Sequence, residues 1–385
     1  MRVNIAMKMK HYDFIFAGGG LAGLSLAYHL AHSPLRDRSI LIVDRDPKDR
    51  NDRTWCFWTR RPTLFDAIVQ REWSQIDFVG EGFARRIGLG DYRYKMIRGL
   101  DFYRHVRQEM GARPNIVFAQ GHVERVEDSA EGAQVWIAGE PVSAAWVFDS
   151  RFDAKNFVPN PARCRCLTQH FKGWEIETAS DAFEPTAATL LDFRTPQKNA
   201  TRFFYVLSFS RRRALIEYVT TRADRYDDAL EEYIKKGLGI GDYKIVATEG
   251  GVNPMSAYVF PRRAGARIMN IGTRGGQIKP STGYAFLRIQ QDSAAIVQSL
   301  LTRGHPFDVP APSRRYRLYD TLMLDVMQRH GDQIESLFSA LFKSNPIARV
   351  LRFLDEEGTL AENAQLIASL PPQLFLQALF RKRGF

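Results

Sequence analysis

Short apolar runs and helical periodicity alternate at the start of the chain. Tyr12–Ala17 is an apolar run that ends at glycine, and Ser39–Val43 is a second apolar run that ends in Asp44. Between them, Leu24–His32 carries apolar residues at helical spacing. The pattern predicts the order strand, glycine loop, helix, strand and acidic residue. It also predicts a helix at Asp101–Met110 and four strands that return to this first sheet: Asn115–Ala119, His122–Val126, Ala133–Ala138 and Ala145–Phe148.

The pattern of hydrophobic and polar residues changes near Cys166, where it predicts long strands in place of alternating strands and helices. The predicted strands are Gln169–Thr178, Thr189–Phe193, Phe203–Phe209 and Ala214–Thr220. A helix is predicted at Asp227–Gly237, a strand at Arg267–Ile271, and helices from Phe286 to the end. We therefore expect an α/β protein: a nucleotide-binding domain (residues 1–165 and 263–300), a sheet-rich insert (166–262) and a helical region (301–385).

Composition narrows the class of protein. The 385 residues are 45% hydrophobic and 25% charged, which is typical of a globular protein. Three cysteines cannot form a disulfide framework, so we expect a reducing, cytoplasmic location and no metal site. No stretch reaches the ~20 apolar residues of a membrane span, and the basic segment Met1–Lys10 lacks the apolar core of a signal peptide. The net charge of +11 is compatible with nucleic acid, with an anionic membrane surface or with no specific partner, although no nucleic-acid-binding module is visible.

The glycines after the first strand fit the pattern G-x-G-x-x-G. Gly18 permits the tight turn, Gly20 lets a pyrophosphate approach the backbone, and Gly23 lets the helix pack closely on the strand. The helix N-terminus attracts phosphate, and Asp44 can accept hydrogen bonds from a ribose. We predict a dinucleotide site, for FAD or NAD, formed by Gly18, Gly20, Leu21, Ala22, Gly23, Asp44 and Arg45.

A second glycine-rich segment follows the strand near Ile271. It contains Gly272, Gly276, Pro280, Thr282 and Gly283, and a helix begins close to Tyr284. An ordinary glycine turn would look similar. Two such loops some 250 residues apart, however, favour a large cofactor bound by both, and therefore FAD over NAD.

Two further segments are candidates for cofactor contacts. Asn51–Trp58 (NDRTWCFW) contains Arg53, which could contact FAD phosphates or form a buried brace with Asp52. Asp149 lies in FDSR, directly after a predicted strand of the nucleotide domain, where a cofactor contact is expected.

Taken together, these motifs resemble the FAD-dependent lycopene cyclases of the bacterial β-cyclase type. The resemblance covers about Tyr12 to Phe380, and its most specific marks are the DRTW segment and the strand LIEY that contains Glu217. It implies the Rossmann-like FAD-binding fold of aromatic hydroxylases and geranylgeranyl reductases. The hydroxylases usually have Gly-Asp at the second loop, whereas this chain has Gly272-Thr273, which argues against a hydroxylase.

The resemblance implies a reaction as well as a fold. Lycopene cyclases close β-ionone rings on lycopene, giving β-carotene through γ-carotene, with reduced FAD, NADPH or NADH as reductant, and no net redox change. A flavin-dependent reductase or monooxygenase of isoprenoids, and a non-catalytic carotenoid-binding flavoprotein, are the alternatives.

Glu217 is the first candidate for the acid or base of this reaction. It is the single carboxylate in the apolar strand Ala214–Thr220, where Leu215 and Val219 share its face. A buried carboxylate is costly unless it is paired or protonated, so its pKa should be raised. The family's essential glutamate also falls on this position, whereas the alternative is an exposed edge-strand glutamate paired with Arg212 or Arg213. The pattern leaves open whether Glu217 or the reduced flavin delivers the proton.

A second acidic candidate is Asp355-Glu356 in RFLDEEGTL. These residues either lie on a solvated face or line the substrate tunnel with Arg352. Because lycopene resides in the bilayer, we also expect peripheral binding to the cytoplasmic face of the membrane. The segment Leu366–Phe385, apolar with a basic end, is either the membrane contact or a helix packed on the core.

Overall fold

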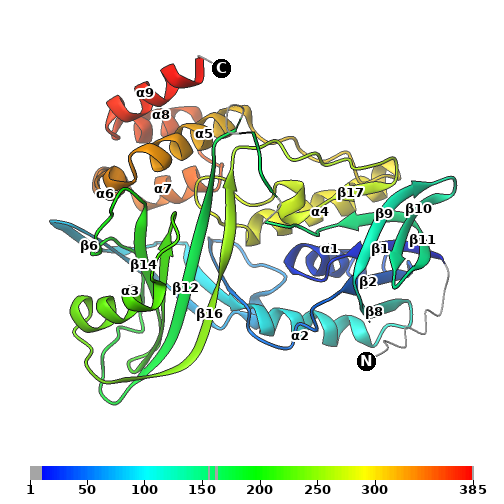
Figure 1. The fold of residues 1–385 in the computed structure, drawn as a ribbon, viewed down its shortest axis with the longest axis horizontal. Helices are drawn as coiled ribbons and strands as arrows, with labels where there is room; N and C mark the ends of the chain where they lie inside the picture. Colours follow the sequence, from blue (N-terminus) through cyan, green and yellow to red (C-terminus); the bar gives the residue numbers. More distant parts are fainter. Residues whose placement is uncertain (1–10, 155–156, 161–163, 384–385) are drawn as a thin grey trace.

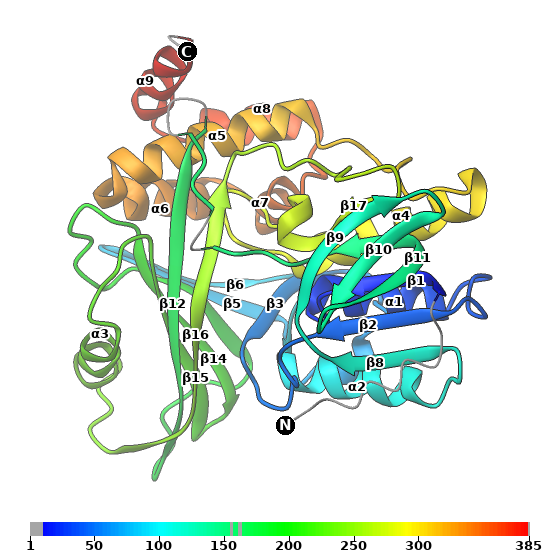
Figure 2. The same ribbon diagram turned by 45° about the vertical axis from the view of Figure 1, so that its right-hand side comes forward.

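The computed structural model describes residues 11–154, 157–160 and 164–383. Met1–Lys10 and Phe385 lie outside the described residues. Two seven-stranded sheets stand side by side, and a group of helices covers one end of the second sheet (Figure 1). The first sheet belongs to the predicted nucleotide-binding region, and five of the seven strands of the second sheet belong to the insert (Figure 2).

The first sheet has the strand order β8-β2-β1-β11-β10-β9, and β17 pairs with the end of β11. The pairs β1·β2, β2·β8, β1·β11 and β11·β17 are parallel, so their carboxyl ends meet at one edge. The predicted strands of this domain are present, with ends that differ by a few residues. Their bounds are β1 His11–Ala17, β2 Ile40–Asp44, β8 Ile116–Gln120, β9 Val123–Ser129, β10 Gly132–Ile137, β11 Glu140–Asp149 and β17 Ile268–Asn270.

Three helices pack against this sheet. α1 (Leu21–Ala31) and α2 (Gly99–Gly111) correspond to the predicted helices, and α4 (Phe286–Arg303) begins two residues after Tyr284. All but one residue of α1 are buried, because the helix lies between the sheet and α4. Apolar side chains from the strands and the three helices form one continuous core that includes Phe16, Leu24, Phe102, Phe148 and Ile296.

The second sheet has the order β16-β12-β15-β14-β13-β5-β6. The four strands predicted from Cys166 onward form its centre. They are β12 Cys166–Thr178, β13 Ala187–Asp192, β14 Arg202–Ser210 and β15 Arg213–Thr220. The predicted helix at Asp227–Gly237 is α3 (Tyr226–Glu232), continued by a π-helical turn, η2 (Tyr233–Gly237).

Three strands of the second sheet differ from the sequence-based picture. β16 (Tyr243–Ser256) has no counterpart among the predicted strands. β5 (Gln75–Gly80) and β6 (Phe83–Gly88) lie within residues 1–165, which were assigned to the nucleotide domain, yet they extend the second sheet by parallel pairing of β5 with β13. The chain therefore enters the second sheet once before the insert begins.

A small three-stranded sheet connects the two halves. Its order is β3-β7-β4, with bounds β3 Thr54–Thr59, β7 Arg93–Arg98 and β4 Arg71–Trp73; a 3-10 turn, η1 (Asp66–Ile68), precedes β4. β3 begins at Thr54, so strand pairing holds the second half of the DRTW motif, Thr54 and Trp55.

The helical C-terminal region packs across the end of the second sheet (Figure 1). Its elements are α5 Arg314–Arg329, η4 Gly331–Gln333, α6 Ile334–Ser344, α7 Ile347–Leu354, α8 Leu360–Ala368 and α9 Pro372–Arg383. Their apolar faces share a core with the sheet. Within the described residues, no helix is both long and apolar enough to cross a bilayer.

Candidate functional site

The first glycine loop has the geometry that a pyrophosphate site requires. Gly18 has a φ of 110°, which only glycine adopts freely. A Cβ at Gly23 would lie 2.0 Å from the Gly18 carbonyl oxygen, so this position must be glycine for α1 to pack against the loop. A Cβ at Gly20, in contrast, would meet no atom within 4 Å. The space above Gly20 is therefore open to a ligand at the N-terminus of α1, beside Leu21 and Ala22.

Asp44 lies at the carboxyl end of β2, beside this loop. Its Oδ2 accepts a hydrogen bond of 2.7 Å from the Gly19 amide, and its Oδ1 accepts one of 2.8 Å from the Asp46 amide. Each carboxylate oxygen keeps acceptor capacity for a ribose hydroxyl. Arg45 is exposed, and its carbonyl accepts from Gln120.

The second glycine segment meets the first, as expected for one large cofactor. Gly272 has a φ of 59°, and a Cβ there would lie 2.6 Å from the Cβ of Ala22, in the first turn of α1. Residues 272–275 form a 3-10 turn (η3), which Gly276 ends in the left-handed conformation. The two loops, far apart in sequence, thus meet at the N-terminus of α1.

Arg53 and Asp149 differ from each other in their surroundings. The Arg53 side chain is 45% exposed and its Nε lies 3.7 Å from Asp52 Oδ2, so the two residues form a partly exposed pair and not the buried brace that was the alternative to a phosphate contact. Asp149 is buried, and both of its carboxylate oxygens accept hydrogen bonds from Arg151, with Arg274 3.4 Å away. Its carboxylate is thus already neutralised by two guanidinium groups. Next to it, Ser150 packs against Gly18.

The remaining part of the second loop contacts the C-terminal helices. Lys279 is buried and its Nζ lies 3.0 Å from Asp320 Oδ1 and 3.1 Å from Glu356 Oε1. Ser281 also donates a hydrogen bond to Asp320. Pro280 and Thr282 are partly buried between these anchors, and Gly283 (φ 79°) passes close to Gln169 of β12.

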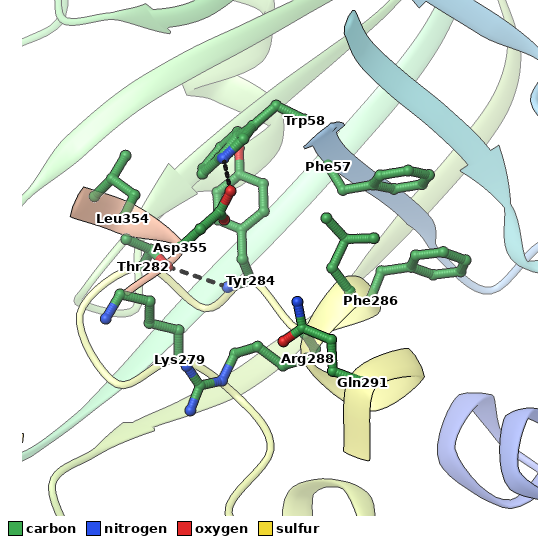
Figure 3. Close-up of a pocket in the computed structure, with 12 residues that line it drawn as sticks. Phe57, Trp58, Lys279, Thr282, Tyr284, Phe286, Arg288, Gln291, Leu354 and Asp355 are labelled. Atoms are coloured by element: carbon green, nitrogen blue, oxygen red, sulfur yellow. Dashed lines mark hydrogen bonds between the residues drawn. The ribbon is translucent and has the colours of Figure 1, made fainter. Parts of the chain in front are cut away.

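Glu356 and Asp355 have opposite electrostatic environments. Burial raises the pKa of Glu356, but the charges of Lys279 and Arg288 outweigh it and hold the pKa below its usual value. Burial raises the pKa of Asp355 to about 7, although Trp58 Nε1 donates a hydrogen bond to it. Asp355 lines a small pocket with Trp58, Tyr284 and Phe286 (Figure 3). Both residues are partly buried, and Arg352 is not part of the lining of this pocket but pairs with Glu362.

A larger apolar cavity lies between the second sheet and the C-terminal helices. It encloses about 610 Å³, including its open mouth. Its walls are mostly hydrocarbon. The aromatic side chains that line it are Trp58, Phe203, Tyr205, Tyr284, Phe338 and Phe342, and the aliphatic ones include Leu190, Val219, Met255 and Leu354. Such a lining suits an elongated hydrophobic molecule.

Glu217 lies in an interior strand next to this cavity. β15 is bordered by β14 and β12, so the alternative of an exposed edge strand is wrong. Arg213 instead binds Glu175, and Arg212 binds Asp181. The register places Glu217 directly beside Tyr205, and Val219, two residues on, faces the cavity.

The surroundings of Glu217 favour its protonated form. Burial raises its pKa well above the usual value, and the negative charge of Glu249 raises it further. Burial also raises the pKa values of Tyr205 and Tyr284, to which the charge of Glu217 contributes. The hydroxyls of Tyr284 and Tyr94 lie 3.1 Å apart. The site can therefore hold a neutral carboxylic acid beside hydroxyl groups and aromatic rings.

Glu249, which the sequence analysis did not identify, faces the carboxyl group of Glu217. It is 7% exposed and lies on β16 in the segment TEGGVNP, whose two glycines and proline are typical of a loop. The proline is tolerated because β16 is an edge strand. A lone glutamate before Gly-Gly gave no signal that could have found it.

Comparison with known proteins assigns a family to this geometry. The chain matches the family described as lycopene cyclase protein over residues 13–380. The chain belongs to the lycopene cyclase family. A chloroplastic lycopene beta cyclase of Arabidopsis thaliana is 25% identical over 330 residues, which are 77% of this chain and 61% of the Arabidopsis protein.

Solved structures show the same fold at low sequence identity. A geranylgeranyl bacteriochlorophyll reductase-like protein of Thermoplasma acidophilum superposes with a TM-score of 0.61 and 11% identity over 96% of this chain and 99% of its own. The flavin-dependent brominase Bmp2 gives 0.64 with 14% identity over 97% of this chain and 99% of its own. HpxO of Klebsiella pneumoniae, solved with FAD, gives 0.64 with 13% identity over 90% and 98%. The fold is thus the FAD-binding α/β fold predicted from the sequence.

Proposed function

We propose that this lycopene cyclase family member closes β-ionone rings on the linear ends of lycopene, giving β-carotene through γ-carotene. The observation that carries the proposal is the place of Glu217: a protonatable carboxyl group on an interior strand, beside an apolar cavity. A hydrocarbon substrate can be bound only through contacts with its apolar surface. It needs a positioned acid that is protonated when the substrate is bound, and the site combines both requirements.

In the proposed reaction, Glu217 donates its proton to the terminal double bond of the carotene. The tertiary carbocation that forms is attacked by a second double bond, which closes the six-membered ring. Loss of a ring proton then gives the β-ionone end, so one proton is gained and one is lost, and the product is an isomer. The rings of Tyr205, Tyr284 and Trp58 offer their faces to the cation, and the apolar walls keep out water, which would trap it as an alcohol.

FAD is the proposed cofactor. Gly18, Gly20, Gly23 and the α1 N-terminus would hold its pyrophosphate, Asp44 its ribose, and residues 272–283 its ring end. When bound in the reduced form, with NADPH or NADH as reductant, it supplies negative charge close to the developing cation. The open space above Gly20 and the contact between Gly272 and Ala22 support this assignment.

A peripheral position on the cytoplasmic face of the membrane completes the proposal, because the substrate dissolves in the bilayer. The exposed apolar side chains of the last two helices support it: Leu360 and Ile367 on α8, and Leu376 and Phe380 on α9. The net charge of +11 favours an anionic surface.

The test is an anaerobic incubation of the purified protein with lycopene, FAD and NADPH, followed by pigment chromatography and mass spectrometry. We expect monocyclic and then bicyclic products of unchanged mass. A product that is heavier by oxygen or by hydrogen would instead identify a monooxygenase or a reductase. The variant Glu217→Gln should bind FAD normally but lose at least ~100-fold in turnover, the scale of a general acid. Turnover at the wild-type rate would refute the role of Glu217.

A further inference from the structure

Glu217 and Glu249 lie in one row across three adjacent strands. Gly173 of β12 is the register partner of Glu217 on β15 and of Glu249 on β16. Directly paired residues point to the same face of a sheet, so both carboxylates flank a position that has no side chain. A Cβ at Gly173 would lie 3.2 Å from Glu249 Cγ and 3.7 Å from Glu217 Cβ. The Glu249 side chain therefore extends over Gly173, toward Glu217.

The two carboxylate oxygens of Glu249 differ in their hydrogen bonding. Oε2 accepts a hydrogen bond of 2.7 Å from Thr54 Oγ1 and one of 3.0 Å from Asn51 Nδ2. Oε1 is buried and has no hydrogen-bond partner among the described residues. A buried carboxylate oxygen without a partner is expensive, and a proton shared with a neighbouring carboxyl group would satisfy it. Both donors come from the segment Asn51–Trp58, which therefore takes part in this site.

Like charges so close together cannot both be ionised at low cost. Burial raises the pKa of Glu249 to about 7, whereas the hydrogen bond from Thr54 and the charges of Arg98 and Arg53 act in the opposite direction. Among the residues that the structure describes, no such donor reaches Glu217, whose pKa is raised further. The asymmetry favours the proton on Glu217 and, above about pH 7, the negative charge on Glu249.

We propose that Glu217 and Glu249 share one proton across Gly173, with Glu249 holding Glu217 in its acid form and returning a proton to it after each turnover. The inference rests on the proposed cyclisation. Glu217 gives its proton to the substrate, the proton lost in ring formation returns to the pair, and the count is unchanged. Glu249 is thus a positioning residue that acts through Glu217.

The titratable groups that face Glu217 and Glu249 have to be considered in the expected pH dependence of turnover. Cys56 of β3, Tyr205 of β14 and Tyr284 face Glu217, and burial raises the pKa of each, so they stay neutral near pH 7. The groups that face Glu249 are Arg53, Arg98 of β7, Glu175 of β12 and Cys56. Of these, Glu175 is already paired with Arg98 and Arg213.

The decisive experiment is the pH profile of turnover for three variants. In the wild type, turnover should rise with pH as Glu249 ionises near pH 7 and fall where Glu217 loses its proton. In Glu249→Gln the rise of turnover at low pH should be absent. The fall of turnover at high pH should move to lower pH by about one unit or more, because the charge that raises the pKa of Glu217 is gone. Thr54→Val removes a donor to the carboxylate, so the acid limb should move to higher pH. Glu177→Gln, an exposed glutamate on β12, is the matched control and should keep the wild-type profile.

Infrared spectroscopy tests the pair without the reaction. In protein made with isotopically labelled glutamate, which separates these groups from Asp355, the carboxylic acid band should lose one component as the pH rises through about 7. Glu249→Gln should abolish that component. The proposed pairing would be overturned if Glu249→Gln kept both limbs of the wild-type pH profile of turnover and an unchanged carboxylic acid band. If the wild type forms no cyclic product, the proposed function fails, while the infrared titration and Thr54→Val still decide whether the pair exists.

Discussion

Trp58 Nε1 donates a hydrogen bond of 2.7 Å to Asp355 Oδ2, joining residues 297 positions apart in the chain. The bond fixes the turn after α7 against β3, between the C-terminal helices and the small connecting sheet. It stabilises the charged form of Asp355, but burial outweighs it and raises the pKa to about 7.

A raised carboxyl pKa makes folding pH-dependent in a definite direction. The unfolded chain loses the Asp355 proton near pH 4 and the folded chain near pH 7, so the stability contributed by the protonated form is present below pH 4 and lost as the pH rises to 7. We expect this group to account for a loss on the order of 4 kcal/mol in the free energy of unfolding. In Asp355→Asn this part of the pH dependence should vanish, as measured by denaturant unfolding at pH 4 to 8. Asp332→Asn, at an exposed position, should keep the wild-type slope.

Two glycines of the first loop should respond to alanine in different ways. The methyl group of Gly20→Ala would enter open space, so the free protein should melt as the wild type does, while the FAD dissociation constant rises about tenfold or more. Gly23→Ala would place its methyl group against the Gly18 carbonyl oxygen and should destabilise the fold itself. Flavin fluorescence titration and thermal melting separate the two effects. Equal FAD affinity in Gly20→Ala and the wild type would count against the site.

Lys279 should be worth more than an ordinary surface lysine. Its ammonium group lies between Asp320 and Glu356, and Lys279→Met would leave the buried carboxylate of Asp320 without its cation. We expect a loss of about 3 to 5 kcal/mol in the free energy of unfolding by urea. Lys235→Met, which removes an exposed pair with Glu231, is the control and should change little. An equally small change in both variants would show that the Lys279 cluster is not stabilising.

The last helix provides a test of membrane binding. Leu376 and Phe380 of α9 are 50% and 67% exposed, and replacing both by serine should weaken co-sedimentation with anionic vesicles about tenfold or more. Binding of the wild type should fall as salt is added. Ile245→Ser removes an exposed apolar side chain at the start of β16, far from α9 in Figure 1, and should leave binding unchanged. If the double variant sediments like the wild type, α9 is not the contact.

Local patterns predicted the elements whose signals are local. β1, β2 and α1 follow from an apolar run, a glycine loop and helical spacing, and β12 to β15 from long apolar stretches. The interior position of Glu217 followed from the apolar residues on both faces of its strand. In each of these cases the residues that decide the outcome are sequence neighbours.

The rest depends on contacts between distant segments. Nothing in the sequence of β5 shows that it pairs with β13, more than a hundred residues later. β16 escaped prediction because Gly250, Gly251 and Pro254 disfavour a strand, yet long pairing with β12 holds it in place. Glu249 was hidden for the same reason: its partners, Thr54 and Gly173, become its neighbours only in the folded sheet.

The contact between Gly272 and Ala22 affects when, during synthesis of the chain, the proposed cofactor site becomes complete. Translation proceeds from the N-terminus, so the first glycine loop and α1 leave the ribosome some 250 residues before the loop that closes over them. Until residues 272–283 have emerged, only one wall of the dinucleotide site exists. We therefore expect the proposed flavin to be captured late in the biogenesis of this protein, and we expect a chain that stops before residue 272 to have the nucleotide signature without the ability to retain the nucleotide.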